Sequence, residues 1–188
     1  MKPDQNTALL LIDFQKGFSA PLWGARNNPD AEANAMRLLA AWRTAGAPVV
    51  HVRHLSREPD SPLGRTGAAW IDGLAPQADE VVFEKHVNSA FIGTGLHDWL
   101  CSRDLGALVI AGLTTPHCVS TSCRMAANLG FQVTLAHDAC AAFASNADTS
   151  WSPDAPPVTP QQIHDMAISQ LHGEFVTARS AAAILCHE

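Results

Sequence analysis

The chain has 188 residues, of which 47% are hydrophobic and 16% are charged. A chain this rich in apolar residues can build a core, which excludes a disordered tail, and no apolar run reaches the roughly 18 residues typical of a membrane span. Twelve Lys and Arg residues against eighteen Asp and Glu residues give a formal net charge of −6. Because there is also no basic run, nucleic acid is not an expected partner. We expect one domain over residues 1–188.

Strands and helices are predicted to alternate along the chain. In chain order, the pattern predicts strands at 7–13, 48–54, 80–84, 106–111, 131–136 and 174–178, with helices at 29–45, 93–104, 116–129, 160–172 and after the last strand. The first helix has clear boundaries, with Asn28 as its N-cap, Pro29 at its first position and Gly46 at its end. Residues 138–159 are predicted as a long loop. The alternation favours an α/β fold around a mostly parallel sheet.

The five cysteines are irregularly spaced and form no CxxC pair: Cys101, Cys118, Cys123, Cys140 and Cys186. The apolar run before Asp13 is too short for the core of a signal peptide. We therefore expect reduced thiols and a cytoplasmic location, without a disulfide framework or a zinc site. A reduced thiol is available for chemistry, so at least one of the five is a candidate catalytic group.

Three polar residues fall at or just beyond the carboxyl ends of predicted strands. Asp13 ends the first strand, Lys85 ends the third and Cys118 lies just after the fourth, whereas the other two lysines, Lys2 and Lys16, do not end a strand. Ligands of open parallel sheets bind beyond that edge. We therefore expect an acid, a lysine and a thiol to meet in one crevice, as a base, an electrostatic partner and a nucleophile.

Cys118 has the most informative local sequence. Thr115 is a predicted N-cap and Pro116 suits the first helical position, which places Cys118 in the first turn of its helix. Free backbone N–H groups and the positive end of the helix dipole there favour a thiolate, and the same N–H groups can hold an oxyanion. The alternative is a small buried cysteine without a chemical role.

Asp13 and Lys85 each have a second interpretation as well. Asp13 follows the run LLLI, so its carboxyl group lies at the rim of an apolar core, where a raised pKa suits a general base. The alternative is an exposed N-cap or salt-bridge acid. Lys85 follows VVFE, and its alternative is a surface lysine at a strand end.

Three segments carry a resemblance to a known family: LLLIDFQKGF (9–18), EKHVNSAFIGTGL (84–96) and AGLTTPHCVSTSCRMAANLGFQV (111–133). Weaker support comes from HVRH (51–54), DACAAF (138–143) and IHDMAISQLHGEF (163–175). Over residues 7–180 the chain resembles the isochorismatase-like cysteine hydrolases, a superfamily that includes nicotinamidases, N-carbamoylsarcosine amidohydrolases and ureidoacrylate amidohydrolases. The resemblance implies a three-layer α/β/α sandwich around a six-stranded, mostly parallel sheet of Rossmann-like topology. It also implies a homodimer or homotetramer.

The resemblance assigns roles to the three polar residues. It implies that Asp13 takes the proton of the Cys118 thiol, while Lys85 holds the acid and the substrate electrostatically. Cys118 would attack a carbonyl group, expel ammonia or an amine, and leave a thioester that water hydrolyses. The backbone N–H groups of Thr114 and Cys118 would form the oxyanion hole, after a cis peptide bond between Leu113 and Thr114.

Metal and cofactor sites are not expected. His51 and His54 invite a metal interpretation, but the Asp-x-His cluster that nicotinamidases use is missing. The segment GTGL (93–96) lacks the third glycine of a dinucleotide fingerprint, and no P-loop occurs. His164 and His172 lie about 80° apart on a helix and are predicted as interface or core positions. The predicted substrate contacts are Phe18, Trp23, Asn88, Phe91, His117 and Trp151.

The function that these features favour is hydrolysis of a C–N bond in a small carboxamide, carbamoyl or ureido compound, without metal or cofactor. The small-molecule amide is then the expected partner, with no nucleic acid and no membrane. One alternative keeps the fold but cleaves a vinyl ether as isochorismatases do, with Asp13 as the acid. Another is a non-catalytic or redox protein that retains the fold. The loops at 16–28, 56–79 and 138–160 shape the pocket and follow no code from which the substrate could be predicted.

Overall fold

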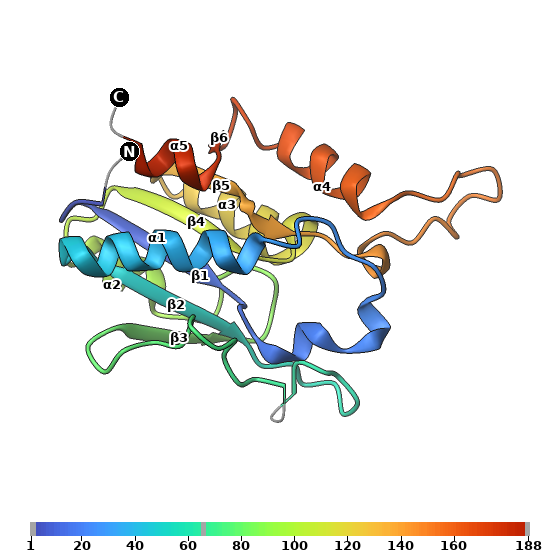
Figure 1. Ribbon diagram of the computed structural model, residues 1–188, viewed down its shortest axis with the longest axis horizontal. Helices are drawn as coiled ribbons and strands as arrows, with labels where there is room; N and C mark the ends of the chain where they lie inside the picture. Colours follow the sequence, from blue (N-terminus) through green and yellow to red (C-terminus); the bar gives the residue numbers. More distant parts are fainter. Residues whose placement is uncertain (1–2, 65–66, 187–188) are drawn as a thin grey trace.

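Six parallel strands form one sheet in the part of the chain that the structure describes. The computed structural model describes residues 3–64 and 67–186, and Lys2 lies outside these ranges. The strands are β1 (Thr7–Ile12), β2 (Val49–His54), β3 (Val81–Lys85), β4 (Ala107–Leu113), β5 (Gln132–Ala141) and β6 (Thr177–Arg179). They lie in the order β3-β2-β1-β4-β5-β6, and every neighbouring pair is parallel (Figure 1). The predicted α/β class is confirmed, with a sheet that is parallel throughout.

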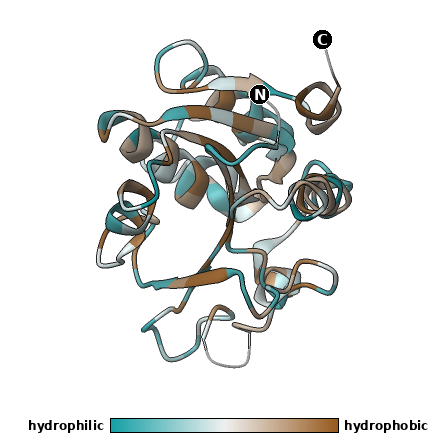
Figure 2. Cartoon of the chain, turned by 90° about the vertical axis from the view of Figure 1, so that its left-hand side faces the viewer, coloured by the Kyte–Doolittle hydropathy of each residue, from teal (hydrophilic) through white to brown (hydrophobic). Residues whose placement is uncertain are grey.

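Helices cover both faces of the sheet. Successive residues of β1 point to opposite faces, as the two-residue period of a strand requires, so that Leu9 joins one core cluster and Leu10 the other. Helices α1 (Ala31–Ala45) and α5 (Ala181–Leu185) pack on the first face, and α2 (Leu96–Cys101) and α3 (Ser120–Asn128) pack on the second. Hydrophobic residues accordingly follow the strands through the middle of the molecule (Figure 2). The predicted three-layer arrangement is confirmed.

The remaining elements lie near the carboxyl ends of the strands. The turns η1 (Lys16–Ser19), η2 (Pro21–Trp23) and η4 (Ala144–Asn146) and the π-helical turn η3 (Thr115–Val119) connect strands to helices there. Helix α4 (Pro160–Ser169) follows a loop that projects from the body of the molecule (Figure 1). Within the described ranges, no helix combines the length and apolarity that crossing a bilayer requires. All five cysteines are free.

The start of the first helix differs from the prediction. Helix α1 begins at Ala31 with Asp30 as its N-cap, two residues later than an Asn28 cap would place it. Asn28 has a positive φ of 42°, and its side-chain Nδ2 donates to the carbonyl oxygen of Cys140 at 2.8 Å. The amide group therefore makes a long-range contact with β5, and the positive φ differs from the extended conformation that an N-cap residue adopts. Gly46 ends the helix in the left-handed conformation, as predicted.

The boundaries of four other elements also differ from the prediction. Strand β5 runs to Ala141 and takes in the start of the predicted loop at 138–159, because Cys140 pairs with Gly112 after a register shift between β4 and β5. The predicted helix at 116–129 is divided into η3 and α3, and α2 and α4 are each shorter than predicted. A Cβ atom on Gly112 would lie 2.4 Å from the carbonyl oxygen of Ile12. The glycine thus lets β4 approach β1 where both strands end.

Candidate active site

The three predicted polar residues meet at the carboxyl edge of the sheet. Asp13 follows β1, Lys85 ends β3 and Cys118 lies in η3 after β4. The Lys85 Nζ atom lies 2.7 Å from Asp13 Oδ2 and 3.2 Å from Cys118 Sγ. All three are buried, with 0% of Asp13, 1% of Lys85 and 7% of Cys118 exposed. The expected convergence is therefore present.

The backbone at the end of β1 turns Asp13 into the site. The Asp13 N–H donates to the carbonyl oxygen of Val52 at 2.8 Å, which keeps the residue attached to β2. Its φ of 57° is left-handed, a conformation that costs a non-glycine residue about 1–2 kcal/mol. Lys85 Nζ contacts Oδ2, whereas Oδ1 has no hydrogen-bond partner among the described residues. One carboxylate oxygen thus remains available to accept a proton.

Burial dominates the electrostatics of the site. It raises the pKa of Asp13, and the opposing charge of Lys85 reverses only part of that effect. Burial disfavours the Lys85 ammonium too, but Asp13 and Cys118 outweigh it and hold the pKa of Lys85 above its usual value. Each group thus favours the charged form of the other.

The Cys118 thiol differs from the expectation of a thiolate. Burial, followed by the negative charge of Asp13, raises the pKa of Cys118 to about 12 although Lys85 opposes the change. Low exposure and a neighbouring carboxylate therefore outweigh the helix start that favoured a thiolate. The resting sulfur carries its proton, and a base has to remove that proton before the sulfur can attack.

A pocket of about 400 Å³ opens onto Cys118. The rings of Phe18 and Trp23 form one wall, 4.9 Å apart between centroids, and Trp23 Nε1 donates to the carbonyl oxygen of Gly17 at 2.9 Å. Polar residues line the rest of the pocket, among them His54, Ser56, Arg57, Glu58, Asn88 and His117.

Four of the six predicted substrate contacts line this pocket: Phe18, Trp23, Asn88 and His117. Asn88 Oδ1 lies 3.7 Å from the Cys118 sulfur. Burial lowers the pKa of His117, so its imidazole is neutral near pH 7.

The other two predicted substrate contacts, Phe91 and Trp151, lie elsewhere in the structure. Phe91 is buried in the core and stacks on Phe131, with 6.0 Å between ring centroids, because the chain enters the core from Ser89 onward after three exposed residues. Trp151 is 81% exposed in the projecting loop. Neither residue lines the pocket beside Cys118.

The predicted oxyanion-hole residue Thr114 also lines the pocket. The peptide bond between Leu113 and Thr114 is cis, as the resemblance implies. The N–H of Thr114 has no hydrogen-bond acceptor within the described ranges. A free N–H beside a sulfur nucleophile is a suitable donor for an oxyanion.

His54 was missed as a member of this group. Its Nδ1 atom lies 3.2 Å from Lys85 Nζ, and its backbone N–H donates to Gln15 Oε1 at 2.7 Å. Burial, with the charge of Lys85, lowers the pKa of His54 to about 4, so the imidazole is neutral. A signal was present, because His54 ends β2 in the way that Asp13 follows β1 and Lys85 ends β3.

The ligand atoms of Asp13, His54 and Cys118 lie within 4.8 Å of one another, a spacing that suits a metal ion. Lys85 Nζ, however, contacts all three, at 2.7 Å, 3.2 Å and 3.2 Å. A metal cation at the same place would be repelled by the ammonium. The set fits a charge-paired triad better than a metal centre.

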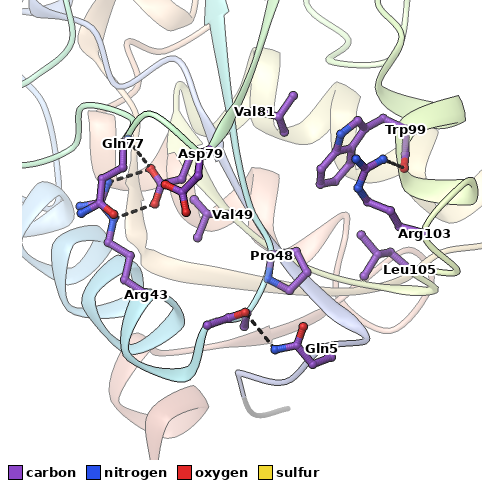
Figure 3. Close-up of a pocket in the computed structure, with 13 residues that line it drawn as sticks. Gln5, Arg43, Pro48, Val49, Gln77, Asp79, Val81, Trp99, Arg103 and Leu105 are labelled. Carbon is purple, nitrogen blue, oxygen red and sulfur yellow. Dashed lines mark hydrogen bonds and ion pairs between the residues drawn. The ribbon is translucent and has the colours of Figure 1, made fainter.

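A second cavity, of about 490 Å³, lies at the amino ends of β2 and β3, on the opposite edge of the sheet (Figure 3). Arg43 lies on one side of it, and Trp99 and Arg103 lie on the other. Arg43 Nε is 2.7 Å from Glu80 Oε1, and His51 Nε2 is 2.9 Å from Glu80 Oε2. Burial of Glu80 is outweighed by these partners, and its pKa falls to about 2. The charge of Glu80 is thus already paired, and no cysteine is among the residues that line the cavity.

Comparisons with known proteins identify the family of the chain. The profile of the isochorismatase domain matches residues 7–183. The isochorismatase family protein YrdC of Bacillus subtilis is 40% identical over 93% of this chain and 91% of its own length. The maleamate amidohydrolase of Pseudomonas putida is 29% identical over 96% and 87%. The crystal structure of an isochorismatase-family protein of Chromobacterium violaceum superposes with a TM-score of 0.90 at 38% identity, over 98% of this chain and 94% of that one. With a profile that spans most of the chain and a relative of this similarity, the chain belongs to the isochorismatase family.

Proposed function

We propose that this chain is a cysteine hydrolase that cleaves the C–N bond of a small carboxamide, carbamoyl or ureido substrate. The observation that carries the proposal is the contact of one buried ammonium, Lys85, with both the Asp13 carboxylate and the Cys118 sulfur, at 2.7 Å and 3.2 Å. The nucleophile opens into a pocket of a size for such substrates. The similarity to a maleamate amidohydrolase supports the same class of reaction.

The first half of the reaction forms a thioester. Asp13 accepts the Cys118 proton as the sulfur attacks the substrate carbonyl carbon, which is general-base catalysis of a thiol addition. The carbonyl oxygen becomes an oxyanion, and the N–H groups of Thr114 and Cys118 would bind it. The proton on Asp13 then passes to the substrate nitrogen, the C–N bond breaks, and ammonia or an amine leaves.

The second half returns the enzyme to its starting state. A water molecule loses a proton to Asp13 and attacks the thioester carbon, and the oxyanion forms again at the same N–H groups. When it collapses, the C–S bond breaks, the sulfur regains its proton from Asp13, and the acid product leaves. Lys85 remains an ammonium throughout and stabilises the carboxylate whenever it is charged.

The test is an ammonia-release screen over nicotinamide, N-carbamoyl acids, maleamate, ureidoacrylate, biuret and oxamate. We expect at least one compound to be hydrolysed, and Cys118→Ala to lower its turnover by at least about 10³-fold, because a nucleophile and its base act as a unit. Thermal unfolding of the variant should match that of the wild type. A folded Cys118→Ala protein with wild-type turnover would refute the thioester route.

One observation favours a second candidate, a vinyl-ether hydrolase of the isochorismatase type. Burial raises the pKa of Asp13, which suits an acid as well as a base. That reaction does not need a thiol. Turnover of a vinyl ether that survives alkylation of Cys118 by iodoacetamide would support this candidate over the amide hydrolase.

A further inference from the structure

We propose that His164 is a positioning residue that holds the turn carrying Thr114 and Cys118 in its oxyanion-binding geometry. The inference rests on the proposed function, because it concerns the same turn. His164 belongs to a buried polar chain behind the turn, and none of its members takes part in the reaction steps above. The histidine comes from α4, which is distant in sequence from η3.

The chain of contacts joins three parts of the protein. His164 Nδ1 lies 2.9 Å from Thr115 Oγ1, and His164 Nε2 lies 3.4 Å from Asn28 Nδ2. Asn28 in turn donates to the carbonyl oxygen of Cys140 at 2.8 Å. Thr115 is 0% exposed and His164 is 3% exposed. Water competes little for these contacts.

The hydrogen-bond partners determine which nitrogen of His164 carries the proton. Asn28 Nδ2 is a donor, and its orientation is set by the backbone carbonyl groups of Cys140 and His137. One of the two Nδ2 hydrogens is directed at Cys140, and the other lies between the His137 carbonyl oxygen at 3.3 Å and His164 Nε2 at 3.4 Å. Because an amide nitrogen only donates, we assign the facing Nε2 as the unprotonated nitrogen of the ring. The proton lies on Nδ1 and is donated to Thr115 Oγ1. Burial lowers the pKa of His164 to about 4, in agreement with a neutral ring.

Thr115 is the point at which this chain acts on the site. It follows Thr114, which lines the pocket, and it opens the turn that contains Cys118. Holding the Thr115 side chain therefore limits rotation of the segment that carries both candidate oxyanion donors. The tether runs through Asn28 to strand β5, which is part of the rigid sheet.

A purely stabilising role for His164 would have different consequences from a positioning role. If His164 served stability alone, its replacement would lower the melting temperature and leave the chemistry of the remaining folded protein unchanged. A positioning role predicts a selective loss of reactions that build an oxyanion. Two reagents for Cys118 separate these cases. p-Nitrophenyl acetate acylates the sulfur through an oxyanion, whereas iodoacetamide alkylates it by displacement without one.

Three variants test the hydrogen bond between His164 and Thr115. His164→Phe removes both nitrogens, His164→Asn keeps a donor near the position of Nδ1, and Thr115→Val removes the other partner of the bond. Loss of one oxyanion donor lowers rates by on the order of 10²–10³, so a displaced donor should lower acylation at least about tenfold. We expect that loss in His164→Phe and Thr115→Val, with alkylation within about twofold of wild type and most of the rate regained in His164→Asn. A double variant should lose no more than either single one, since the residues share one interaction.

The proposal is overturned if acylation and alkylation fall by the same factor, or if acylation is unchanged in folded His164→Phe or Thr115→Val protein. Should His164→Phe fail to fold, Thr115→Val and His164→Asn still decide the question. A wild-type protein whose Cys118 reacts with iodoacetamide but not with the ester refutes the proposed function itself, whatever the variants do.

Discussion

Replacing Asp13 by Asn and Lys85 by Met, singly and together, should show that the pair is strongly coupled. The charges lie 2.7 Å apart and both side chains are 0% exposed. At an effective dielectric constant of about 20, their attraction is about 6 kcal/mol at 2.7 Å. Removing one member of such a pair leaves the other charge buried alone, which costs about 3–5 kcal/mol. That is a large part of the 5–15 kcal/mol by which a typical domain is stable.

The double variant should be more stable than the sum of the single changes predicts. With both charges gone, neither buried charge is left without its partner. We therefore expect a coupling free energy of about 3 kcal/mol from the double-mutant cycle, which compares the double variant with the sum of the two single variants. Urea unfolding at neutral pH measures each free energy of unfolding. Single effects that add within about 0.5 kcal/mol in the double variant would refute the reasoning.

The chain contains a matched control for this cycle. Lys16 Nζ and Asp72 Oδ1 lie 2.7 Å apart, but their side chains are 50% and 92% exposed. Water and salt screen such a pair, and its coupling should be no more than about 1 kcal/mol. The same measurements on Lys16→Met, Asp72→Asn and the double variant give the coupling of an exposed pair. Because the two pairs have the same N–O distance, the difference between the two couplings is due to burial.

Two further predictions follow from the site. The value of kcat/KM should fall as the pH decreases through a pKa of Asp13 that lies above its usual value, because the base must be ionised; an acid limb at or below the usual pKa of a free aspartate would contradict this. Trp23→Leu should raise KM because Trp23 forms the pocket wall, whereas Trp151→Leu should change KM by less than about twofold, since a surface substitution away from a site is usually close to neutral. Equal effects of the two tryptophan changes would show that the projecting loop reaches the substrate.

The sequence was sufficient for the fold and for the convergence of Asp13, Lys85 and Cys118. Apolar runs predicted the strands, and the alternation of strands with helices predicted a parallel sheet. Ligands bind at the carboxyl edge of such a sheet, and Asp13, Lys85 and Cys118 are the polar residues predicted to lie there. Long-range contacts were not accessible in the same way. The Asn28 amide donates to carbonyl groups of β5 and does not cap the helix. The local sequence contains no signal for a hydrogen-bond partner more than 100 residues away.

The two tryptophans illustrate the same limit within the site. Trp23 and Trp151 both lie in loops that precede a helix, and their sequences gave no reason to separate them. Trp23 lines the pocket because its indole N–H donates to Gly17 and its ring packs on Phe18. Trp151 has 81% of its surface exposed. The protonation of Cys118 depends likewise on burial and on the nearby Asp13 carboxylate, neither of which the turn sequence encodes.

Strand order explains why His54 has to be part of the site. Lys85 ends β3 and Asp13 follows β1, and β2 lies between these strands. Two strand spacings are roughly 10 Å, so a lysine that reaches the carboxylate must cross the end of β2. The residue there is His54, the register partner of Lys85. A charged histidine at this position would repel the ammonium, and an acid would compete with Asp13 for it. A neutral imidazole, with its pKa lowered to about 4, does neither, and it leaves the charge of Lys85 directed at Asp13 and Cys118.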